Sequence, residues 1–141
     1  MSFANWLEKL MQLPHLEPYT CVIIDDDQIS IDILKAYISR IKEFTMLATY
    51  TDPIAGVEAI RAYGEIDFLF LDIGMEVSGI DIAKVIRDRV KYLIFVTAHE
   101  RHALDAFRVY CDKFFVKPVG YEQIRQAIAH LVKRDNFKGN Y

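Results

Sequence analysis

Five short apolar runs, separated by segments of helical spacing, constrain the fold of this chain more than any other feature. The runs are rich in β-branched and aromatic residues and lie near 21–25, 45–50, 67–72, 92–97 and 113–117. Those at 67–72 and 92–97 are continuously apolar, which is typical of strands covered on both faces. The pattern predicts an α/β fold in which a doubly wound, five-stranded parallel sheet has helices on both faces.

The segments between the runs predict a helix after each strand. The apolar stripe after the first run consists of Ile29, Ile33, Leu34, Tyr37, Ile38 and Ile41. The stripe after the third run consists of Ile80, Ala83, Lys84, Ile86 and Arg87. The buried face of the last helix is expected to consist of Ile124, Ala127, Ile128 and Leu131. Pro53 fits the first turn of a helix that Asp52 caps.

The chain of 141 residues, 52% of them hydrophobic, is predicted to form one domain. We expect this domain at 19–134, with a C-terminal tail or linker start at 135–141. Residues 1–18 form a predicted N-terminal extension with a short helix that docks on its own domain, serves a partner or frays. The apolar face of that helix consists of Phe3, Trp6, Leu7 and Leu10, with Ser2 as its cap and Pro14 and Pro18 ending the segment.

Charge and hydropathy exclude several classes of protein. The net charge of -3 without a long basic run disfavours direct nucleic-acid binding. The apolar runs are far shorter than the ~20 residues of a membrane helix, and Glu8 and Lys9 interrupt the apolar start that a secretory signal needs. We therefore expect a cytoplasmic protein in which Cys21 and Cys111 are reduced, packed thiols.

Polar residues stand where the apolar runs stop. Acidic residues close the first and third runs, Thr97 closes the fourth and Lys117 closes the fifth. Carboxyl ends of parallel strands lie on one edge of a sheet, where open α/β sheets bind ligands. The predicted crevice therefore holds carboxylates, a hydroxyl and an ammonium, a mixture that suits a divalent cation and a phosphoryl group.

These residue types define a specific chemistry. A carboxylate is a competent nucleophile toward a phosphoryl group, and Asp72 is the candidate. Asp25 and Asp26, together with Asp72, offer the oxygen ligands that Mg²⁺ prefers. Lys117 and Thr97 are candidates to bind the phosphoryl oxygens.

Each of these residues also has a purely structural interpretation. Asp26 or Asp27 could cap the helix that begins near Gln28, and Thr97 could cap the next helix along the chain. Lys117 could be a solvated strand end, and Asp72 could begin a loop. Pro118, which follows Lys117, is a candidate for a cis peptide that aims the ammonium into the crevice. The joint occurrence of these residues at four strand ends favours the functional interpretation.

The chain resembles the receiver domains of two-component response regulators over about residues 19–134. The resemblance is carried by the acidic pair in IIDDD, Asp72 in LFLDIGM, Thr97 in FVTA and Lys117-Pro118 in FFVKP. It implies a flavodoxin-like fold with strand order 2-1-3-4-5. The stretch from Thr97 to Pro118 further resembles receivers that are joined to LytTR-type DNA-binding domains.

The resemblance also implies a mechanism. A partner histidine kinase would phosphorylate Asp72, with Mg²⁺ held by Asp25 or Asp26, by Asp72 and by the backbone carbonyl of Gly74. Thr97 and Phe114 would form the switch pair. The face formed by the helix after Thr97, the strand at 113–117 and the last helix would then contact an effector outside this chain or a second copy. Such a phosphoacceptor domain catalyses at most its own phosphorylation and dephosphorylation.

Some positions depart from the family pattern. Glu76 stands where receivers often have proline, and Gly79 comes one position early, so the loop after Asp72 is shortened by one residue. Phe114 lacks a hydroxyl, so packing alone would drive its rotamer change. Gly74 and His99 occupy positions that tune dephosphorylation in the family.

Three other interpretations remain at this point. A degenerate receiver would act purely as a binding module. A haloacid dehalogenase-like phosphatase would use Asp25 as nucleophile and Asp27 as general acid, but the acidic pair that it needs after Lys117 is missing, since only Glu122 and Asp135 occur there. A flavin carrier of the flavodoxin type needs a hydroxyl-rich phosphate loop, whereas three aspartates after the first strand would repel the phosphate.

Overall fold

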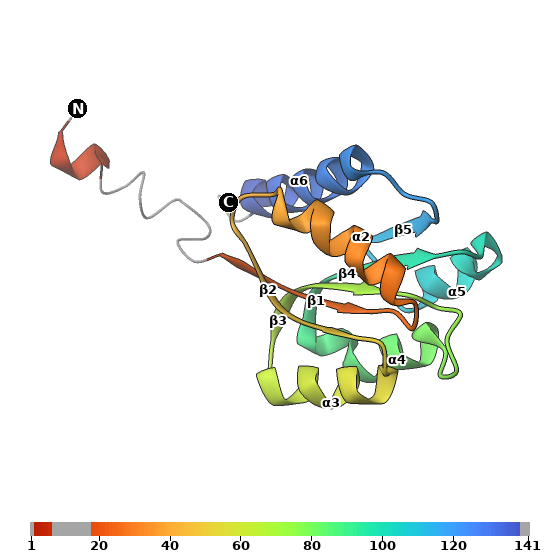
Figure 1. Ribbon diagram of the computed structural model, residues 1–141. Helices are drawn as coiled ribbons and strands as arrows, with labels where there is room; N and C mark the ends of the chain where they lie inside the picture. Colours follow the sequence, from red (N-terminus) through yellow and green to blue (C-terminus); the bar gives the residue numbers. More distant parts are fainter. Residues whose placement is uncertain (1, 7–17, 139–141) are drawn as a thin grey trace.

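The computed structural model describes residues 2–6 and 18–138, and a five-stranded sheet organises the main body (Figure 1). The strands are β1 (Tyr19–Ile24), β2 (Phe44–Tyr50), β3 (Ile66–Leu71), β4 (Val90–Thr97) and β5 (Lys113–Val116). The α-helices are α2 (Gln28–Ser39), α3 (Pro53–Tyr63), α4 (Gly79–Ile86), α5 (Ala103–Arg108) and α6 (Tyr121–Lys138). Short 3₁₀ turns at Arg87–Arg89 and Glu100–His102 follow α4 and precede α5.

All neighbouring strands pair in parallel, in the order β2-β1-β3-β4-β5. Helices α2 and α6 cover one face of the sheet, and α3, α4 and α5 cover the other (Figure 1). The predicted flavodoxin-like, doubly wound architecture is therefore confirmed. Because the strand order reverses between β1 and β3, the carboxyl ends of these two strands border the crevice in which such sheets bind ligands.

The hydrophobic core has two layers because successive side chains of a strand point to opposite faces of the sheet. In β3, Leu69 and Leu71 pack toward α3, α4 and α5, whereas Phe68 and Phe70 pack toward α2 and α6. All four side chains are at most 1% exposed. Covering on both faces explains why this run is continuously apolar.

The predicted stripe of the first helix was partly wrong. In α2 the buried residues are Ile31, Leu34 and Ile38, while Ile29 is 69% and Ile33 is 47% exposed. The chain offers apolar residues at alternate positions here, and residues two apart on a helix lie about 200° apart around its axis. Ile29 and Ile31 therefore cannot both face the sheet, and packing selects Ile31.

A similar correction applies to α4. Its buried residues are Gly79, Ile82, Ala83 and Ile86. Lys84, which the predicted stripe included, is instead exposed and lies 3.9 Å from the carboxylate of Asp81. Ile82 takes the inward position because it lies one turn before Ile86 on the face toward the sheet.

Several local predictions are confirmed. Asp52 accepts a hydrogen bond from the Ile54 amide and caps α3, with Pro53 in its first turn. The predicted face of α6 is buried at all four positions. Cys21 is buried and Cys111 is partly buried, and both are free thiols.

The termini differ in part from expectation. Helix α6 continues to Lys138, so residues 135–138 extend the last helix where we expected a tail, and the domain boundaries themselves stay a prediction. Residues 3–6 form a helical turn in which the Asn5 amide donates to Ser2 Oγ and Phe3 and Trp6 are exposed. The rest of the predicted helix, with Leu7 and Leu10, and the Pro14 that was expected to help end the segment lie outside the described residues. Every helix in the described part of the chain is too short or too polar to span a bilayer.

The packing of α2 yields a matched test. We expect Leu34→Ala to lower the free energy of unfolding by about 2–5 kcal/mol, because it removes a buried side chain and leaves a cavity. The neighbouring Ile33→Ala should change it by less than about 1 kcal/mol, because Ile33 is largely exposed. Urea denaturation followed by circular dichroism measures both. Equal losses in the two variants would contradict the observed orientation of α2.

Candidate functional site

Four strand ends meet at one edge of the sheet. Asp25 follows β1, Asp72 follows β3, Thr97 ends β4 and Lys117 follows β5. Backbone hydrogen bonds continue past the strands: the Asp25 amide donates to Tyr50 O (3.0 Å), Asp72 to Ile24 O (3.0 Å) and Lys117 to Thr97 O (2.8 Å). These backbone hydrogen bonds therefore place the polar side chains at the same level along the strands, at one edge of the sheet.

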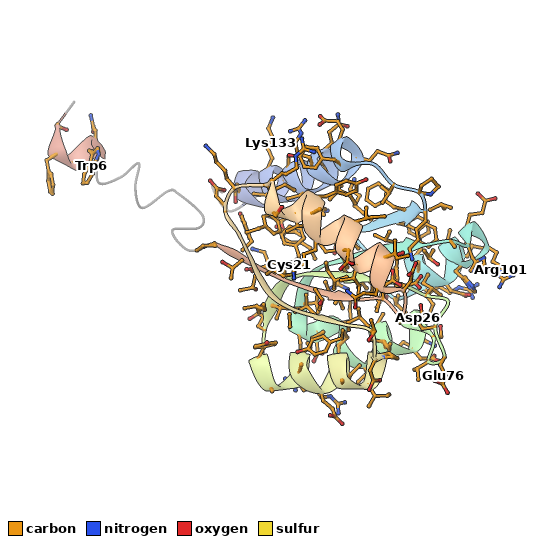
Figure 2. The ribbon with its side chains drawn as sticks, viewed as in Figure 1. Trp6, Cys21, Asp26, Glu76, Arg101 and Lys133 are labelled. Atoms are coloured by element: carbon orange, nitrogen blue, oxygen red, sulfur yellow. The ribbon has the colours of Figure 1, made fainter. Side chains whose placement is uncertain are left out.

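Three carboxylates converge at this edge. One oxygen each from Asp25, Asp26 and Asp72 lies within 4.8 Å of the other two. Asp25 and Asp72 are buried, while Asp26 is exposed at the rim (Figure 2). Opposite ligands in a Mg²⁺ octahedron are about 4 Å apart. The cluster therefore fits one hard divalent cation with small side-chain adjustments.

Lys117 supplies the positive charge of the cluster. Its Nζ lies 2.7 Å from Asp25 Oδ2 and 3.9 Å from Asp72 Oδ2. The peptide bond between Lys117 and Pro118 is cis, as the sequence led us to expect. The ammonium thus lies between the two buried carboxylates.

The two oxygens of Asp72 have different surroundings. Oδ1 accepts a hydrogen bond from the Ile73 amide at 2.8 Å. Oδ2 has only the long contact with Lys117 among the described residues. Asp72 is therefore held by one oxygen, while the other faces the ammonium of Lys117.

Burial dominates the electrostatics of Asp25. It raises the pKa of this carboxyl above the ordinary value of 3.8, and the nearby charge of Asp72 acts in the same direction. The hydrogen bonds from Lys117 and from the Asp27 amide oppose the rise in pKa without cancelling it. The site thus holds a buried negative charge that a bound cation would stabilise.

The structural interpretation holds for Asp27. Its side chain caps α2, accepting hydrogen bonds from the Ile29 amide (3.1 Å) and from the Ser30 hydroxyl (2.9 Å). Both carboxylate oxygens are therefore engaged away from the cluster. This leaves Asp27 without the geometry of a general acid beside Asp25, which the phosphatase interpretation requires.

Thr97 is not a helix cap. It is completely buried, and its Oγ1 has no hydrogen-bond partner among the described residues. A buried hydroxyl without a partner costs free energy. Thr97 ends β4 at the edge that carries the carboxylates, so a ligand oxygen bound there would satisfy this hydroxyl once the side chain turned toward it.

Phe114 is less buried than Thr97. It is partly buried, packs into the core beneath α4 and α5, and its ring centroid is 6.4 Å from that of Phe95. In the β4–β5 register Phe114 pairs with Phe95, whereas Thr97 pairs with Val116. Its role as the switch partner of Thr97 stays a prediction.

The shortened loop packs tightly on Asp72. A Cβ at Gly79 would lie 1.9 Å from the Asp72 carbonyl oxygen and 2.8 Å from Ile73 Cα, and the Gly79 amide donates to Ile73 O at 3.0 Å. The early glycine is thus required because the first residue of α4 touches the backbone of Asp72. Sequence reasoning noted the glycine but missed this contact.

Within the loop, Gly74 and Glu76 are exposed, whereas Met75 and Val77 pack partly buried against the core. Glu76 is exposed at the same end of the molecule as Asp26 (Figure 2). Gly74 faces His99, since a Cβ at Gly74 would lie 3.3 Å from His99 Cδ2.

Sequence reasoning also missed a pocket of about 410 Å³ beside the cluster. It extends from Asp25 and Lys117 to an apolar wall of α2 and the segment after β5. Its lining consists of Asp25, Asp27, Ile29, Ser30, Ile33, Leu34, Tyr37, Val96, Lys117, Pro118 and Val119. The signal that could have indicated it is the run of Ile29, Ile31 and Ile33 at alternate positions, since one helix face cannot bury all three.

Comparison with known proteins agrees with this geometry. The family model for the response regulator receiver domain matches residues 21–129. The chain belongs to the response regulator receiver domains. Receiver domains of this family are, in general, phosphorylated by a histidine kinase.

Curated relatives are response regulators. The chain is 33% identical over 115 residues to the sensory transduction protein LytT of Enterococcus faecalis, covering 79% of this chain and 47% of the relative. It is 29% identical over 116 residues to an uncharacterised response regulatory protein of Vibrio vulnificus, covering 81% and 48%. These relatives are consistent with the LytTR-type resemblance. The receiver domain spans about half the length of the curated relatives it matches.

Solved structures share the fold. The response regulatory domain of mrkE from Klebsiella pneumoniae aligns with a TM-score of 0.73 at 21% identity, covering 82% of this chain and 96% of that one. CheY in a CheX-CheY-BeF₃-Mg complex from Borrelia burgdorferi aligns with a TM-score of 0.73 at 23% identity, covering 82% and 90%.

The raised pKa of Asp25 predicts a pH-dependent stability. The folded state holds the proton of the Asp25 carboxyl more tightly than the unfolded state does. The resulting stabilisation of the fold is fully present below about pH 4 and is lost as the pH rises through the pKa of Asp25 in the folded state. Without divalent cations, we expect Asp25→Asn to raise the melting temperature at pH 7 by about 3 °C, the effect of roughly 1 kcal/mol. The gain should vanish near pH 4.

Calorimetry in the presence of a chelator measures this difference. Asp26→Asn is the matched control and should have a smaller effect, because Asp26 is exposed. A lower melting temperature for Asp25→Asn at pH 7 would mean that the ion pair with Lys117 outweighs the cost of burial.

The loop contact predicts that Gly79→Ala destabilises the domain. The new Cβ would overlap the Asp72 carbonyl, so the backbone must shift, at a cost of about 1–3 kcal/mol in the free energy of unfolding. Gly120→Ala is the control, because a Cβ there would meet only a flexible side-chain atom of Gln123 at 3.9 Å. Chemical denaturation of both variants provides the comparison, and equal stabilities would refute the close approach.

Proposed function

We propose that this receiver domain accepts a phosphoryl group on Asp72 from a partner histidine kinase or a small phosphodonor, in the presence of Mg²⁺. The observation that carries the proposal is the asymmetry of Asp72. One of its oxygens is fixed by the Ile73 amide, and the other faces Lys117 in a buried cluster of carboxylates.

In the proposed reaction, Asp72 Oδ2 attacks the phosphorus atom. The bond from phosphorus to the donor breaks, and its electron pair leaves with the donor. Lys117 stabilises the charge on one phosphoryl oxygen. Thr97 donates to another the hydroxyl hydrogen bond that has no acceptor among the described residues.

The carboxylates of Asp25, Asp26 and Asp72 fit the role of Mg²⁺ ligands, and the Gly74 carbonyl is the further ligand that the family implies. Bound there, Mg²⁺ would neutralise the clustered carboxylates and the charge that builds up on the phosphoryl oxygens. Gly74 and His99, which lie against each other, would set the lifetime of the aspartyl phosphate through access to Asp72.

The new charge at Asp72 would then change a partner contact. Movement of Thr97 toward the phosphoryl group alters the packing around Phe114 and shifts the face formed by α5, β5 and α6. In our proposal this face contacts an effector domain or downstream protein outside this chain, or a second copy, in the cytoplasm. The domain itself catalyses at most its own phosphorylation and dephosphorylation.

A degenerate, phosphorylation-independent binding module is the second candidate. The observation that favours it is the tight packing of the shortened loop on Asp72. If that packing prevents Asp72 from adopting a reactive geometry, the receiver domain would bind partners in a single conformation.

One experiment separates these candidates. We expect incubation with Mg²⁺ and acetyl phosphate to add one phosphoryl group, which intact-protein mass spectrometry detects, and Asp72→Asn to abolish the addition because the nucleophile is gone. Omission of Mg²⁺ and Asp26→Asn should each slow the reaction, and we expect decreases on the order of tenfold or more.

Asp32→Asn serves as the control, since Asp32 is exposed on α2 outside the cluster. Modification that survives Asp72→Asn but disappears in Asp25→Asn would overturn the receiver mechanism in favour of a phosphatase-like one. Failure of the wild-type protein to bind beryllofluoride or accept a phosphoryl group would favour the binding module.

A further inference from the structure

The backbone of Asp72 and the first residue of α4 are packed without clearance. A Cβ at residue 79 would overlap the Asp72 carbonyl oxygen, and the Gly79 amide donates a hydrogen bond to Ile73 O. Ser78 caps the helix by accepting a hydrogen bond from the Ile80 amide. A shift of the Asp72 main chain therefore has to displace the start of α4.

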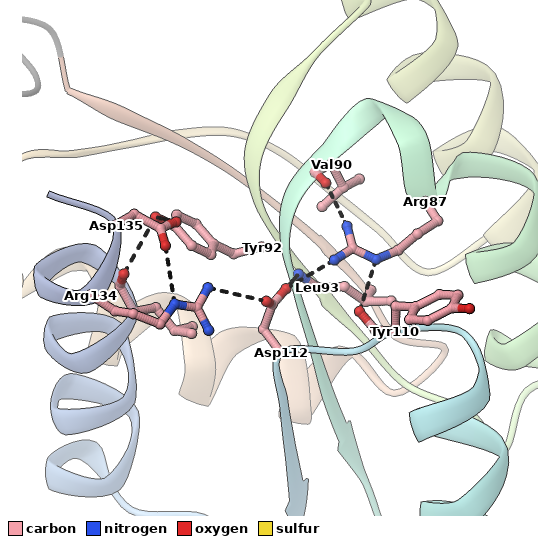
Figure 3. Close-up of polar contacts among 9 residues, drawn as sticks. Arg87, Val90, Tyr92, Leu93, Tyr110, Asp112, Arg134 and Asp135 are labelled. Carbon is pink, nitrogen blue, oxygen red and sulfur yellow. Dashed lines mark hydrogen bonds and ion pairs between the residues drawn. The ribbon is translucent and has the colours of Figure 1, made fainter. Parts of the chain in front are cut away.

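The other end of α4 is fixed just as firmly. Arg87, the C-terminal cap residue of α4, donates from Nε to Tyr110 O (3.0 Å), from Nη1 to Val90 O (2.6 Å) and from Nη2 to Asp112 Oδ2 (3.2 Å). Its partners belong to β4 and to the turn between α5 and β5 (Figure 3). One planar guanidinium thus ties the end of α4 to two neighbouring segments.

Asp112 joins this arginine to α6. Its Oδ2 also accepts the Leu93 amide at 2.8 Å, and its Oδ1 lies 3.7 Å from Arg134 Nη2 (Figure 3). Arg134 in turn pairs with Asp135, which accepts the hydroxyl hydrogen bond of Tyr92. We call Arg87, Asp112 and Arg134 the basal junction, because it lies at the end of the sheet opposite Asp72.

Two of the three charges of the basal junction, those of Asp112 and Arg87, are largely shielded from water. The side chains of Asp112 and Arg87 are 13% and 26% exposed. A partly buried carboxylate between two guanidinium groups is costly to disrupt on one side only, since the remaining groups lose their compensation. The basal junction therefore transmits a displacement of Arg87 to its neighbours more readily than a flexible surface contact would.

We propose that Gly79 is a positioning residue and that α4 links Asp72 to the basal junction, so that modification of Asp72 is felt at the end of α6. The link rests on the proposed phosphorylation of Asp72. It runs from the Asp72 peptide through Gly79 and α4 to Arg87, and from Arg87 through Asp112 to Arg134. It differs from the route through Thr97 and Phe114 because it passes through α4 and reaches α6 at its C-terminal end.

Backbone amides of the basal junction provide a direct test by two-dimensional ¹H–¹⁵N NMR, with Mg²⁺ and beryllofluoride as the probe. The Ile73 and Lys117 amides report binding at Asp72, because they donate to Asp72 Oδ1 and Thr97 O. The Leu93 amide reports the hydrogen bond to Asp112, and the amides of 131–135 report the end of α6. We expect all of these resonances to shift in the wild-type protein.

Arg87→Gln should uncouple the two ends. The Ile73 and Lys117 resonances should still respond, while the responses at Leu93 and 131–135 are lost. Because coupling is reciprocal, the beryllofluoride affinity of this variant should differ from that of the wild type by about fivefold or more. Arg89→Gln, with the same charge change in the same 3₁₀ turn, should leave affinity and responses unchanged.

Arg134→Gln keeps the test decisive if Arg87→Gln does not fold, since Arg134 is the most exposed member of the basal junction, at 40%, and contacts only its Asp112. In this variant the Leu93 response should persist, and the response at 131–135 should be lost. If the Ile73 and Lys117 resonances shift in the wild type while the Leu93 resonance does not, the link through α4 is overturned but the proposed phosphorylation is not. Undiminished responses at 131–135 in both variants would likewise overturn the link. Silence at Ile73 and Lys117 in the wild type would overturn the proposed phosphorylation as well.

Discussion

The parallel hydrogen-bond ladder is the constraint on which the rest of this structure depends. It continues one residue beyond β1, β3 and β5, where the amides of Asp25, Asp72 and Lys117 donate to carbonyls of neighbouring strands. Backbone hydrogen bonds therefore bring the side chains of these three residues to one edge of the sheet, before any side-chain interaction is considered. Because both faces of the sheet are covered by helices, this edge is fixed relative to the core.

The charges placed there work against stability. Burial raises the pKa of Asp25 even though Lys117 donates a hydrogen bond to it, so the folded protein holds a carboxylate in an unfavourable place. Thr97 adds a buried hydroxyl that has no hydrogen-bond partner in the part of the chain that the structure describes. Such costs concentrate at sites that bind ions or react, because a ligand supplies the missing interactions. In this receiver domain, the cation and the phosphoryl group would supply them.

Tight packing of α4 connects this edge to the opposite end of the sheet. Gly79 leaves no space between α4 and the Asp72 peptide, and Arg87 leaves little freedom at the other end of the same helix. A helix held at both ends moves as a unit, and packed elements change between discrete arrangements rather than deforming gradually. The tight loop after Asp72 thus has a structural meaning as a short connection between the proposed acceptor and α4.

The sequence by itself determined the α/β class, the sheet order through the family resemblance, and the strand ends that carry Asp25, Asp72, Thr97 and Lys117. These features depend on hydrophobic runs and on parallel pairing, which a linear pattern records. Only the tertiary structure decided which residues of α2 face the sheet, that Asp27 caps a helix, and that Gly79 touches Asp72. It alone also brought Arg87, Asp112 and Arg134 together. These contacts depend on how helices rotate and pack against the sheet, and residues distant in sequence leave no local pattern from which such packing can be predicted.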